Sequence, residues 1–213
     1  GTVNIHASLL PKYRGAAPIE HALMNNDKIT GLSTFIINNK IDTGSVINQL
    51  EIRISSEDNF KSLYLKLSDK SPKILSSTIS KLLDKNNVVD LILQDESSAT
   101  YAPKITSLDR KIDWNQSSIH IHNKIRAFSP KPGAYTFIDN VRISLIKTEI
   151  ISRIIDKSMD NGEILIDKND MLVKTDSGLI RIIELQVAGK SAFDAQDFIN
   201  GYIKNNGNIR FSK

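Results

Sequence analysis

Residues 3–18 read VNIHASLLPKYRGAAP and organise the N-terminal part of the chain. If residues 3–7 are extended, alternation places Asn4 and His6 on one face of a strand and the intervening apolar residues on the other. An amide donor beside an imidazole is suited to stabilising an oxyanion and to moving a proton near neutral pH. Asparagine and histidine also occur at this spacing by chance, so a surface histidine or a hydrogen-bonded core histidine is the ordinary alternative.

The second half of this segment predicts a loop. Pro11 and Gly15 disfavour helix and strand, so Leu9 and Leu10 are expected to pack from a loop beside the Asn-His pair, with its backbone lining a pocket. The basic side chain of Arg14 is a candidate to hold an anion, although exposed basic side chains in loops more often serve solubility.

A carboxylate follows in Ile41-Asp42-Thr43-Gly44, between two predicted strands. Aspartate in a turn usually accepts hydrogen bonds from nearby backbone N–H groups. In contact with an imidazole, Asp42 would instead orient the ring and stabilise its protonated form. The pattern alone leaves both roles open.

The region 1–85 mixes strand and helix signals, as an α/β layer does. The pattern predicts a helix over 18–24, strands over 32–37 and 45–55, and a helix from about Asn59. Pro72 is expected to interrupt that helix or restart it. A second apolar helical stripe then follows, made of Ile74, Leu75, Ile79, Leu82 and Leu83.

Residues 86–103 lack a helical stripe and end in Pro103, which predicts a linker. Residues 104–213 have a different texture, with a short helix over 119–126 and then β-type segments separated by turn signals. The segments span 134–138, 141–151, 163–166, 171–173 and 179–185. Several short strands with regular turns predict a small barrel domain.

Composition narrows the classes of function. The chain has 213 residues, no cysteine and a net charge of +4, so disulfides, thiolate nucleophiles and cysteine-based zinc sites are excluded. His120 and His122 alternate within a predicted helix and face different sides, so no metal is expected. With no apolar run long enough to cross a bilayer and no signal-peptide pattern, we expect no membrane partner and a cytoplasmic location.

The charge is uneven. Residues 1–103 hold 11 basic and 11 acidic side chains, whereas residues 104–213 hold 17 basic and 13 acidic ones. The excess is concentrated in 101–131, which favours either an ordinary solvated basic surface or a polyanion contact. The six basic residues of this segment are Lys104, Arg110, Lys111, Lys124, Arg126 and Lys131.

Taken together, Asn4-x-His6-x-Ser8-Leu9-Leu10-Pro11-x-x-x-Gly15 and the later Asp42-Thr43-Gly44 resemble the active-site segment of formyltransferases that use 10-formyltetrahydrofolate. The resemblance implies that Asn4, His6 and Asp42 are catalytic and that 10-formyltetrahydrofolate is the co-substrate. It further implies that folate is bound by Ser8, Leu9, Leu10 and Pro11. In this family the segment matching Asn4 follows a nucleotide-binding-like β/α half of about 100 residues, built from βαβ units. We therefore expect the chain to correspond to the part that follows that half.

The C-terminal motifs separate the branches of this family. Ile112-Asp113-Trp114, the run from Ile125 to Tyr135, and Gly189-Lys190-Ser191 with Ala195-Gln196-Asp197-Phe198 resemble the methionyl-tRNA formyltransferase branch more than the sugar formyltransferases. The aromatic side chains of these motifs are expected in the core rather than as base-stacking platforms. The resemblance covers essentially all 213 residues.

This resemblance implies an α/β fold in which the C-terminal part of a parallel-sheet formyltransferase domain (1–85) is followed by a small OB-like β-barrel domain (104–213). It implies a monomer whose partner is initiator methionyl-tRNA. The residues expected to contact tRNA are Arg14, Lys104, Arg110, Lys111, Lys124, Arg126, Lys131 and Lys190. A sugar-nucleotide N-formyltransferase and a catalytically silent RNA-binding module remain the alternatives.

Overall fold

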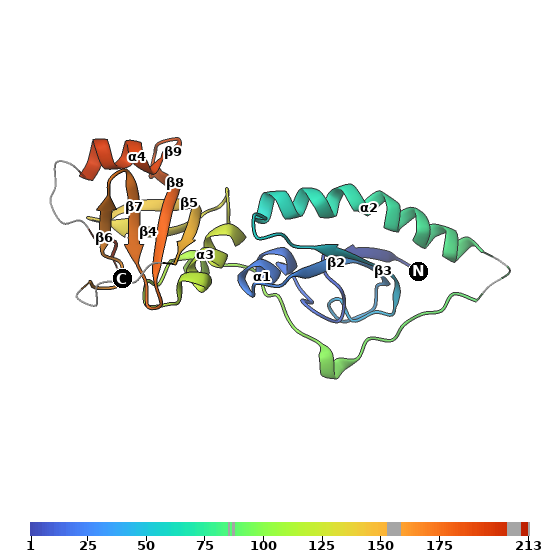
Figure 1. Cartoon of the computed structure of the whole chain (residues 1–213). Coiled ribbons are helices and arrows are strands. Elements are labelled where there is room, and N and C mark those ends of the chain that lie inside the picture. The colour runs from blue at the N-terminus through green and yellow to red at the C-terminus, as the bar shows by residue number, and fades with distance from the viewer. Residues whose placement is uncertain (85, 87, 153–158, 204–209, 213) are drawn as a thin grey trace. The chain divides into compact units, whose positions relative to one another are not determined.

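The computed structural model describes residues 1–212 except 85, 87, 153–158 and 204–209. The chain divides into two units, Gly1–Ile105 and Thr106–Lys213 (Figure 1). Within 86–103, expected to be a linker, the described part from 92 to 102 is hydrogen-bonded along the first unit: Val46 bridges Ile92, and Arg14 bridges Tyr101. This segment therefore belongs structurally with the residues that precede it.

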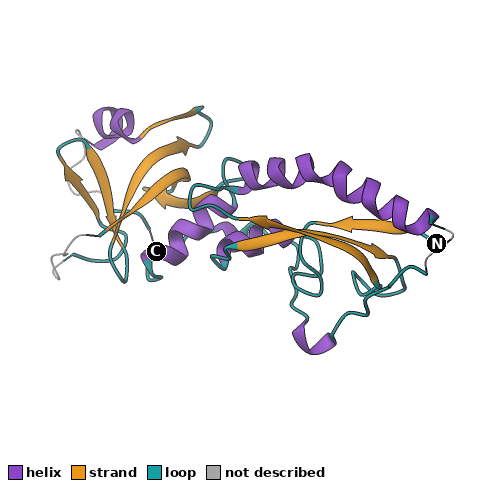
Figure 2. Cartoon of the chain, turned by 45° about the vertical axis from the view of Figure 1, so that its right-hand side comes forward, coloured by secondary structure: helices purple, strands orange, loops and turns teal. Residues whose placement is uncertain are grey.

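The first unit is a three-stranded sheet with one long helix. Its elements are β1 (Val3–His6), α1 (Pro18–Met24), β2 (Ile29–Ile36), β3 (Val46–Arg53), α2 (Phe60–Leu83) and the short 3-10 helix η1 (Glu96–Ser98). α2 runs along one face of the sheet, while the segment carrying η1 passes the opposite side (Figure 2). The central strand β2 is buried along most of its length because it has a neighbour on each side.

The strand pairing differs from the expected parallel sheet. The strands lie in the order β1-β2-β3, and both pairings are antiparallel, with His6 opposite Ser33 and Leu32 opposite Leu50. The connection between β2 and β3 is residues 37–45, which is shorter than the dozen or more residues that a parallel crossover needs. Among the described strands of this unit, the sheet is therefore antiparallel.

α2 begins as expected near Asn59 but does not break at Pro72. Asn59 is the N-cap, and its side chain and that of Ser62 form a capping box. One buried stripe, Leu63, Leu67, Ile74 and Thr78, crosses the proline without a shift, so packing holds the helix together. The hydroxyl of Ser71 donates to the Leu67 carbonyl at 2.9 Å, within the turn that the proline weakens.

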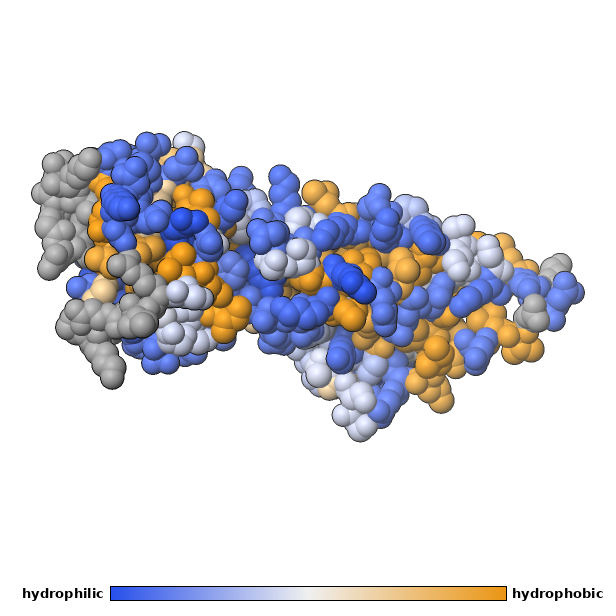
Figure 3. Space-filling model, in the orientation of Figure 1, coloured by the Kyte–Doolittle hydropathy of each residue, from blue (hydrophilic) through white to orange (hydrophobic). Residues whose placement is uncertain are grey.

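The second apolar stripe expected on α2 is largely exposed. Of its five members only Ile74 is buried, whereas Leu75, Ile79, Leu82 and Leu83 are 39–72% exposed. The helix meets the sheet along Leu63, Leu67, Ile74 and Thr78, so residues one position away turn toward solvent. Hydrophobic residues consequently reach the surface of this unit in several places (Figure 3).

The second unit is a six-stranded antiparallel sheet with helices. Its elements are η2 (Leu108–Arg110), α3 (Ser118–Ala127), β4 (Ala134–Ile138), β5 (Val141–Ile151), β6 (Ile164–Asp167), β7 (Asp170–Lys174), β8 (Leu179–Val187), β9 (Ala192–Asp194), α4 (Ala195–Phe198) and the π-helix η3 (Ile199–Ile203). The strand order is β4-β5-β8-β7-β6, with β9 paired to β8. Within the described residues, no pairing closes β6 onto β4.

The turns and core of this unit follow the sequence closely. Asp139 and Asn140 both have positive φ, 49° and 66°, and join β4 to β5 by the two-residue turn that such residues favour. Trp114 is fully buried, stacks on Phe211 with ring centroids 5.2 Å apart, and donates its indole N–H to Thr136. The five predicted β segments are confirmed, and β9 is the strand that the pattern missed.

Candidate active site

His6 and Asp42 come together in the first unit. β1 ends at His6, whose ring is buried, and Nε2 lies 2.8 Å from the carbonyl oxygen of Tyr13. Because a carbonyl only accepts, Nε2 carries a proton. The other ring nitrogen, Nδ1, lies 3.6 Å from Oδ2 of Asp42. In the neutral ring, Nδ1 therefore carries no proton and faces the Asp42 carboxylate. In the protonated ring, Nδ1 carries a proton, and the positive ring interacts favourably with that carboxylate.

The Asp42 turn is held in an unusual conformation. Asp42 has φ 52°, in the left-handed region that non-glycine residues seldom occupy. Its Oδ2 accepts the Gly15 backbone N–H at 2.8 Å, and the same oxygen lies 3.6 Å from the His6 ring. A Cβ at Gly44 would lie 1.6 Å from the Ile36 carbonyl oxygen, so only glycine fits there.

Asn4 shares the strand with His6 but differs in environment. The two residues are two positions apart on β1, hence on the same side of it, with backbones separated by roughly 6.6 Å. The Asn4 side chain is exposed, whereas His6 is 6% exposed. The amide of Asn4 is thus open to a bound molecule next to the His6–Asp42 pair.

The loop expected to bind folate is anchored from beneath by β2 and β3. The Ser33 hydroxyl accepts the Leu10 N–H at 2.9 Å and donates to the Ser8 carbonyl at 2.7 Å. The Gln49 amide donates to the Leu10 carbonyl at 2.8 Å. Ser8 and Leu10 are buried, whereas Leu9 and Pro11 are partly exposed. Ser8 and Leu10 therefore set the shape of the loop, and Leu9 and Pro11 are the members that keep accessible surface.

Tyr13 fixes the other end of the same loop. Its hydroxyl donates to Asp27 at 2.7 Å and accepts from the Asn25 amide at 3.0 Å. Burial, with smaller effects of these partners, raises the pKa of Tyr13 to about 12. The phenol is therefore protonated at neutral pH. Its hydrogen bonds fix Tyr13, whose carbonyl oxygen accepts the hydrogen bond from His6.

Arg14 does not fit the expected contact with tRNA. Its side chain is 1% exposed, and its guanidinium forms two 2.9 Å hydrogen bonds with the Glu96 carboxylate. The Glu96 partner raises the pKa of Arg14 despite the opposing effect of burial, and Arg14 lowers the pKa of Glu96. An internally paired and buried cation is unavailable to a phosphate, so this prediction is corrected.

The other basic residues expected to contact tRNA fall into three groups, exposed, buried and intermediate. Lys104, Lys111, Lys131 and Lys190 are exposed. Arg126 is only 7% exposed and donates to the Asn123 side chain, so its predicted contact with RNA is also corrected.

Lys124 and Arg110 are intermediate. Lys124 donates to the Lys111 carbonyl at 3.2 Å, and burial lowers its pKa. Arg110 is half-buried and donates to the carbonyls of Pro132 and Gly133. Both cations are partly committed to the fold.

Arg142 lies outside the basic segment 101–131 and is not among the residues predicted to contact tRNA. Its guanidinium carbon lies 3.9 Å from the ring centroid of Tyr135, and that of Arg110 lies 5.9 Å from the same ring. The two-residue turn between β4 and β5 fixes the register, placing Arg142 opposite Phe137 and diagonal to Tyr135. The dipeptide Asp139-Asn140 predicts this register from the sequence. It is the signal that could have placed Arg142 beside Tyr135.

Two features are absent from the residues that the structure describes. No cluster of three or more His, Cys, Asp or Glu side chains suited to a metal ion occurs among them. No described helix is long and apolar enough to span a membrane.

Known families match both units. The family described as "Formyl transferase" matches residues 1–79, and "Formyl transferase, C-terminal domain" matches residues 104–203. These two matches, over a mixed α/β unit and the domain that follows it, define the class of protein as a formyl transferase.

The sequence relatives narrow the class. A methionyl-tRNA formyltransferase of Thermodesulfovibrio yellowstonii is 42% identical over 212 residues, covering 100% of this chain and 67% of that protein. One of Syntrophomonas wolfei is 33% identical over 213 residues with the same shares. The chain belongs to the methionyl-tRNA formyltransferase family and spans about two thirds of the length of these relatives.

Solved structures agree on the fold. HypX of Aquifex aeolicus in complex with tetrahydrofolic acid has a TM-score of 0.71 at 17% identity, covering 95% of this chain and 35% of that one. The sugar 3N-formyltransferase WlaRD, in the presence of dTDP and 5-N-formyl-THF, has a TM-score of 0.68 at 26% identity, covering 89% and 66%. The methionyl-tRNA formyltransferase of Clostridium thermocellum has a TM-score of 0.58 at 21% identity, covering 72% and 65%.

Proposed function

We propose that this chain carries the catalytic pair and the second domain of an enzyme that transfers a formyl group from 10-formyltetrahydrofolate to the α-amino group of initiator methionyl-tRNA. The observation that carries the proposal is the 3.6 Å approach of His6 Nδ1 to Asp42 Oδ2 in a chain of this family. The reaction serves translation initiation, which assigns it to the cytoplasm. A monomer is sufficient for it, since all three catalytic side chains, Asn4, His6 and Asp42, come from one unit.

The chemistry begins with attack of the neutral amine on the formyl carbon, which produces a tetrahedral intermediate with a negatively charged oxygen. The exposed amide of Asn4 donates to this oxygen. His6 donates only from Nδ1 and only as the imidazolium, because its Nε2 proton is committed to Tyr13. Preorganised donors of this kind contribute about 2.7–4 kcal/mol each to transition-state stabilisation.

Asp42 supports the protonated ring and proton transfer. The carboxylate lies next to Nδ1 and is held by the Gly15 N–H, so it needs little rearrangement when the ring becomes charged. Collapse of the intermediate breaks the bond between the formyl carbon and N10 of the folate. The proton released by the amine passes to N10 through His6 and Asp42 or through water.

The folate site uses the loop from Ser8 to Pro11. Leu9 and Pro11 are the members with accessible apolar surface and are assigned to contact the co-substrate. Ser8 and Leu10 act indirectly, by holding the shape of the loop. The Leu10 N–H, the Leu10 carbonyl and the Ser8 carbonyl are already hydrogen-bonded to the side chains of Ser33 and Gln49. The residues present therefore suit an apolar, flat ligand resting on a rigid loop.

The second unit is assigned to tRNA. Its exposed Lys111, Lys131 and Lys190 suit phosphate contacts, as does Lys104 at the end of the first unit. The OB-like barrel remains part of this proposal, supported by the five-strand path β4-β5-β8-β7-β6.

The test is a formyl-transfer assay with 10-formyltetrahydrofolate and two acceptors, methionyl-tRNA and a nucleotide-linked amino sugar, using His6→Ala as the blank. Formylation of methionyl-tRNA that this variant loses supports the proposal. Transfer to the sugar alone would assign a sugar formyltransferase. A gel shift with tRNA in the absence of any transfer would assign a silent RNA-binding module.

A further inference from the structure

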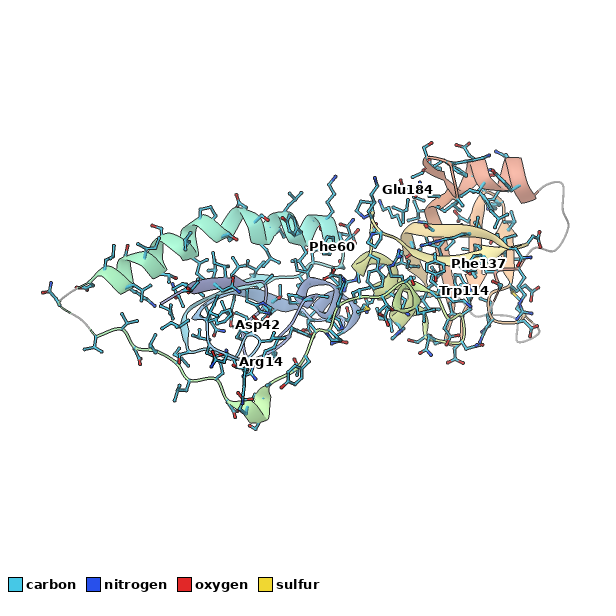
Figure 4. All side chains as sticks on the ribbon, turned by 180° about the vertical axis from the view of Figure 1, so that it is seen from behind. Arg14, Asp42, Phe60, Trp114, Phe137 and Glu184 are labelled. Atoms are coloured by element: carbon cyan, nitrogen blue, oxygen red, sulfur yellow. The ribbon has the colours of Figure 1, made fainter. Side chains whose placement is uncertain are left out.

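The Arg14 side chain connects the catalytic loops to a distant segment of the chain. Besides its two bonds to Glu96, Arg14 donates from Nε to the side-chain oxygen of Gln94 at 3.0 Å. Figure 4 shows Arg14 and Asp42 near each other on the side of the sheet opposite α2. The buried guanidinium thus fixes the direction in which the Gln94 amide points.

Gln94 in turn holds the Asp42 turn by its backbone. Its amide nitrogen donates to the Asp42 carbonyl at 2.8 Å and to the Gly44 carbonyl at 2.7 Å. One side chain therefore bridges the two ends of the three-residue turn and has its own oxygen occupied by Arg14. Both hydrogens of the amide group are used, so its orientation is defined.

The same turn is fixed from its side-chain end by the residue that follows Arg14. The Gly15 N–H donates to Asp42 Oδ2, the oxygen that faces His6. A Cβ at Gly15 would lie 2.6 Å from the Ala102 carbonyl oxygen, so this close approach of the chain requires glycine. The Asp42 backbone is therefore held by Gln94, which Arg14 orients, and the Asp42 carboxylate is held by Gly15.

We propose that Gln94, oriented by the Arg14–Glu96 ion pair, is a positioning residue that holds the Asp42 carboxylate in place beside His6 for formyl transfer. The inference rests on the proposed function. Asp42 occupies a left-handed conformation that a loose turn would leave, and its carboxylate would move with the backbone. A displacement of about 1 Å in a catalytic group is enough to lower a rate by on the order of 100-fold.

Two substitutions separate positioning from simple attachment of the segment. Gln94→Leu removes every hydrogen bond of the side chain and replaces it with an apolar side chain of similar size. Gln94→Glu keeps an acceptor for Arg14 but cannot donate to the Asp42 and Gly44 carbonyls. Ser98→Ala is the matched control, because it removes a hydrogen bond within the same segment, the 2.6 Å bond from the Ser98 hydroxyl to Asp95 Oδ2, that involves neither Asp42 nor Gly15.

The experiment measures kcat, both KM values and the urea midpoint of each variant, together with the Gly15 amide resonance in the full chain. Both Gln94 variants are expected to lose about 10- to 100-fold in kcat with KM within about twofold, and to shift the Gly15 amide. Ser98→Ala is expected to keep kcat and the Gly15 resonance.

Unchanged kcat in the Gln94 variants, a loss confined to KM, or an equal loss in Ser98→Ala would overturn the inference. If the unsubstituted protein transfers no formyl group, the proposed function fails instead. The Gly15 resonance then decides on its own whether Gln94 positions Asp42, since an unmoved resonance contradicts it without any activity.

Discussion

His6 Nδ1 lies 3.6 Å from Asp42 Oδ2, although 35 residues separate the two along the chain. The remaining contacts of each side chain are to backbone atoms: Nε2 to the Tyr13 carbonyl and Oδ2 to the Gly15 N–H. Both partners lie in the loop that follows β1. That loop therefore sets the orientation of the ring and of the carboxylate at the same time.

Asp42→Asn tests the charge of this pair. The amide keeps an oxygen for the Gly15 N–H but no longer stabilises a positive ring, so formyl transfer is expected to fall by about 100- to 10,000-fold. His6→Ala should fall within the same range. Single-turnover assays measure the loss, and thermal unfolding checks that Asp42→Asn folds normally. Near-normal turnover in either variant would remove the pair from the mechanism.

Asn4→Ala tests the second oxyanion donor. Because the side chain is exposed, its loss should leave stability unchanged and lower kcat by about 100- to 1,000-fold. Asn39→Ala, at an exposed asparagine in the loop between β2 and β3, is the control and should retain full activity. Equal rates for the two variants would show that Asn4 makes no contact in the transition state.

Local patterns were sufficient for much of this site. Alternation in residues 3–7 placed Asn4 and His6 on one strand face, and the turn signals located three hairpin connections in the second unit, β4–β5, β6–β7 and β7–β8. The family motif brought Asp42 to His6 as expected. These features depend on neighbours in sequence or on a motif of fixed spacing, which a single sequence displays directly.

Long-range pairing was beyond local patterns. The partner of Arg14 lies 82 residues away in η1, so its charge was interpreted as a surface feature. Pro72 was expected to break α2 because its local cost is visible in sequence, while the buried stripe that outweighs this cost depends on where the sheet lies. Sequence therefore indicated which residues matter at the site more reliably than how they are paired.

Ser33→Ala tests how the folate loop is held. The hydroxyl joins Ser8, Leu10 and Gln49, so its removal leaves buried polar groups unpaired, at a cost of about 1–3 kcal/mol in stability. The loosened loop should raise KM for 10-formyltetrahydrofolate more than KM for the acceptor.

Thr34→Val is the matched control for Ser33→Ala. Thr34 is the next residue on β2, and its hydroxyl is hydrogen-bonded to Thr78 of α2 on the opposite face. It should lose stability to a similar extent without changing either KM. Parallel urea titrations and steady-state kinetics compare the two variants. A similar rise in KM for both would mean that general loosening, rather than the loop, is responsible.

The double variant Lys111→Ala with Lys131→Ala tests the proposed tRNA surface. Both side chains are exposed, so the fold should persist while tRNA binding weakens and the slope of log K against log salt falls by roughly 1 to 2. Lys61→Ala with Lys73→Ala on α2 makes the same change in net charge at exposed positions and serves as the control. Filter binding over a salt series measures both slopes. Equal slopes for the two double variants would place the RNA elsewhere.

Asp58→Asn tests the start of α2 and its dependence on pH. Asp58 is buried, and although burial raises its pKa, hydrogen bonds from Lys66, the Ser55 N–H and Ser62 outweigh this effect and lower it overall. A lowered folded-state pKa adds stability above the unfolded value of about 3.9, and that stability is lost as pH falls through the folded pKa. The variant should therefore be less stable by about 1–3 kcal/mol at neutral pH, with the difference shrinking below about pH 4.

Asp69→Asn is the control, because Asp69 pairs with Lys70 at the surface and its loss should not change the unfolding midpoint. Urea unfolding between about pH 3 and about pH 7 measures the stability of both variants. This range includes the ordinary pKa of an aspartate, about 3.9. A difference for Asp58→Asn that stays constant over this range would show that packing, and not the charge of the carboxylate, stabilises the start of the helix.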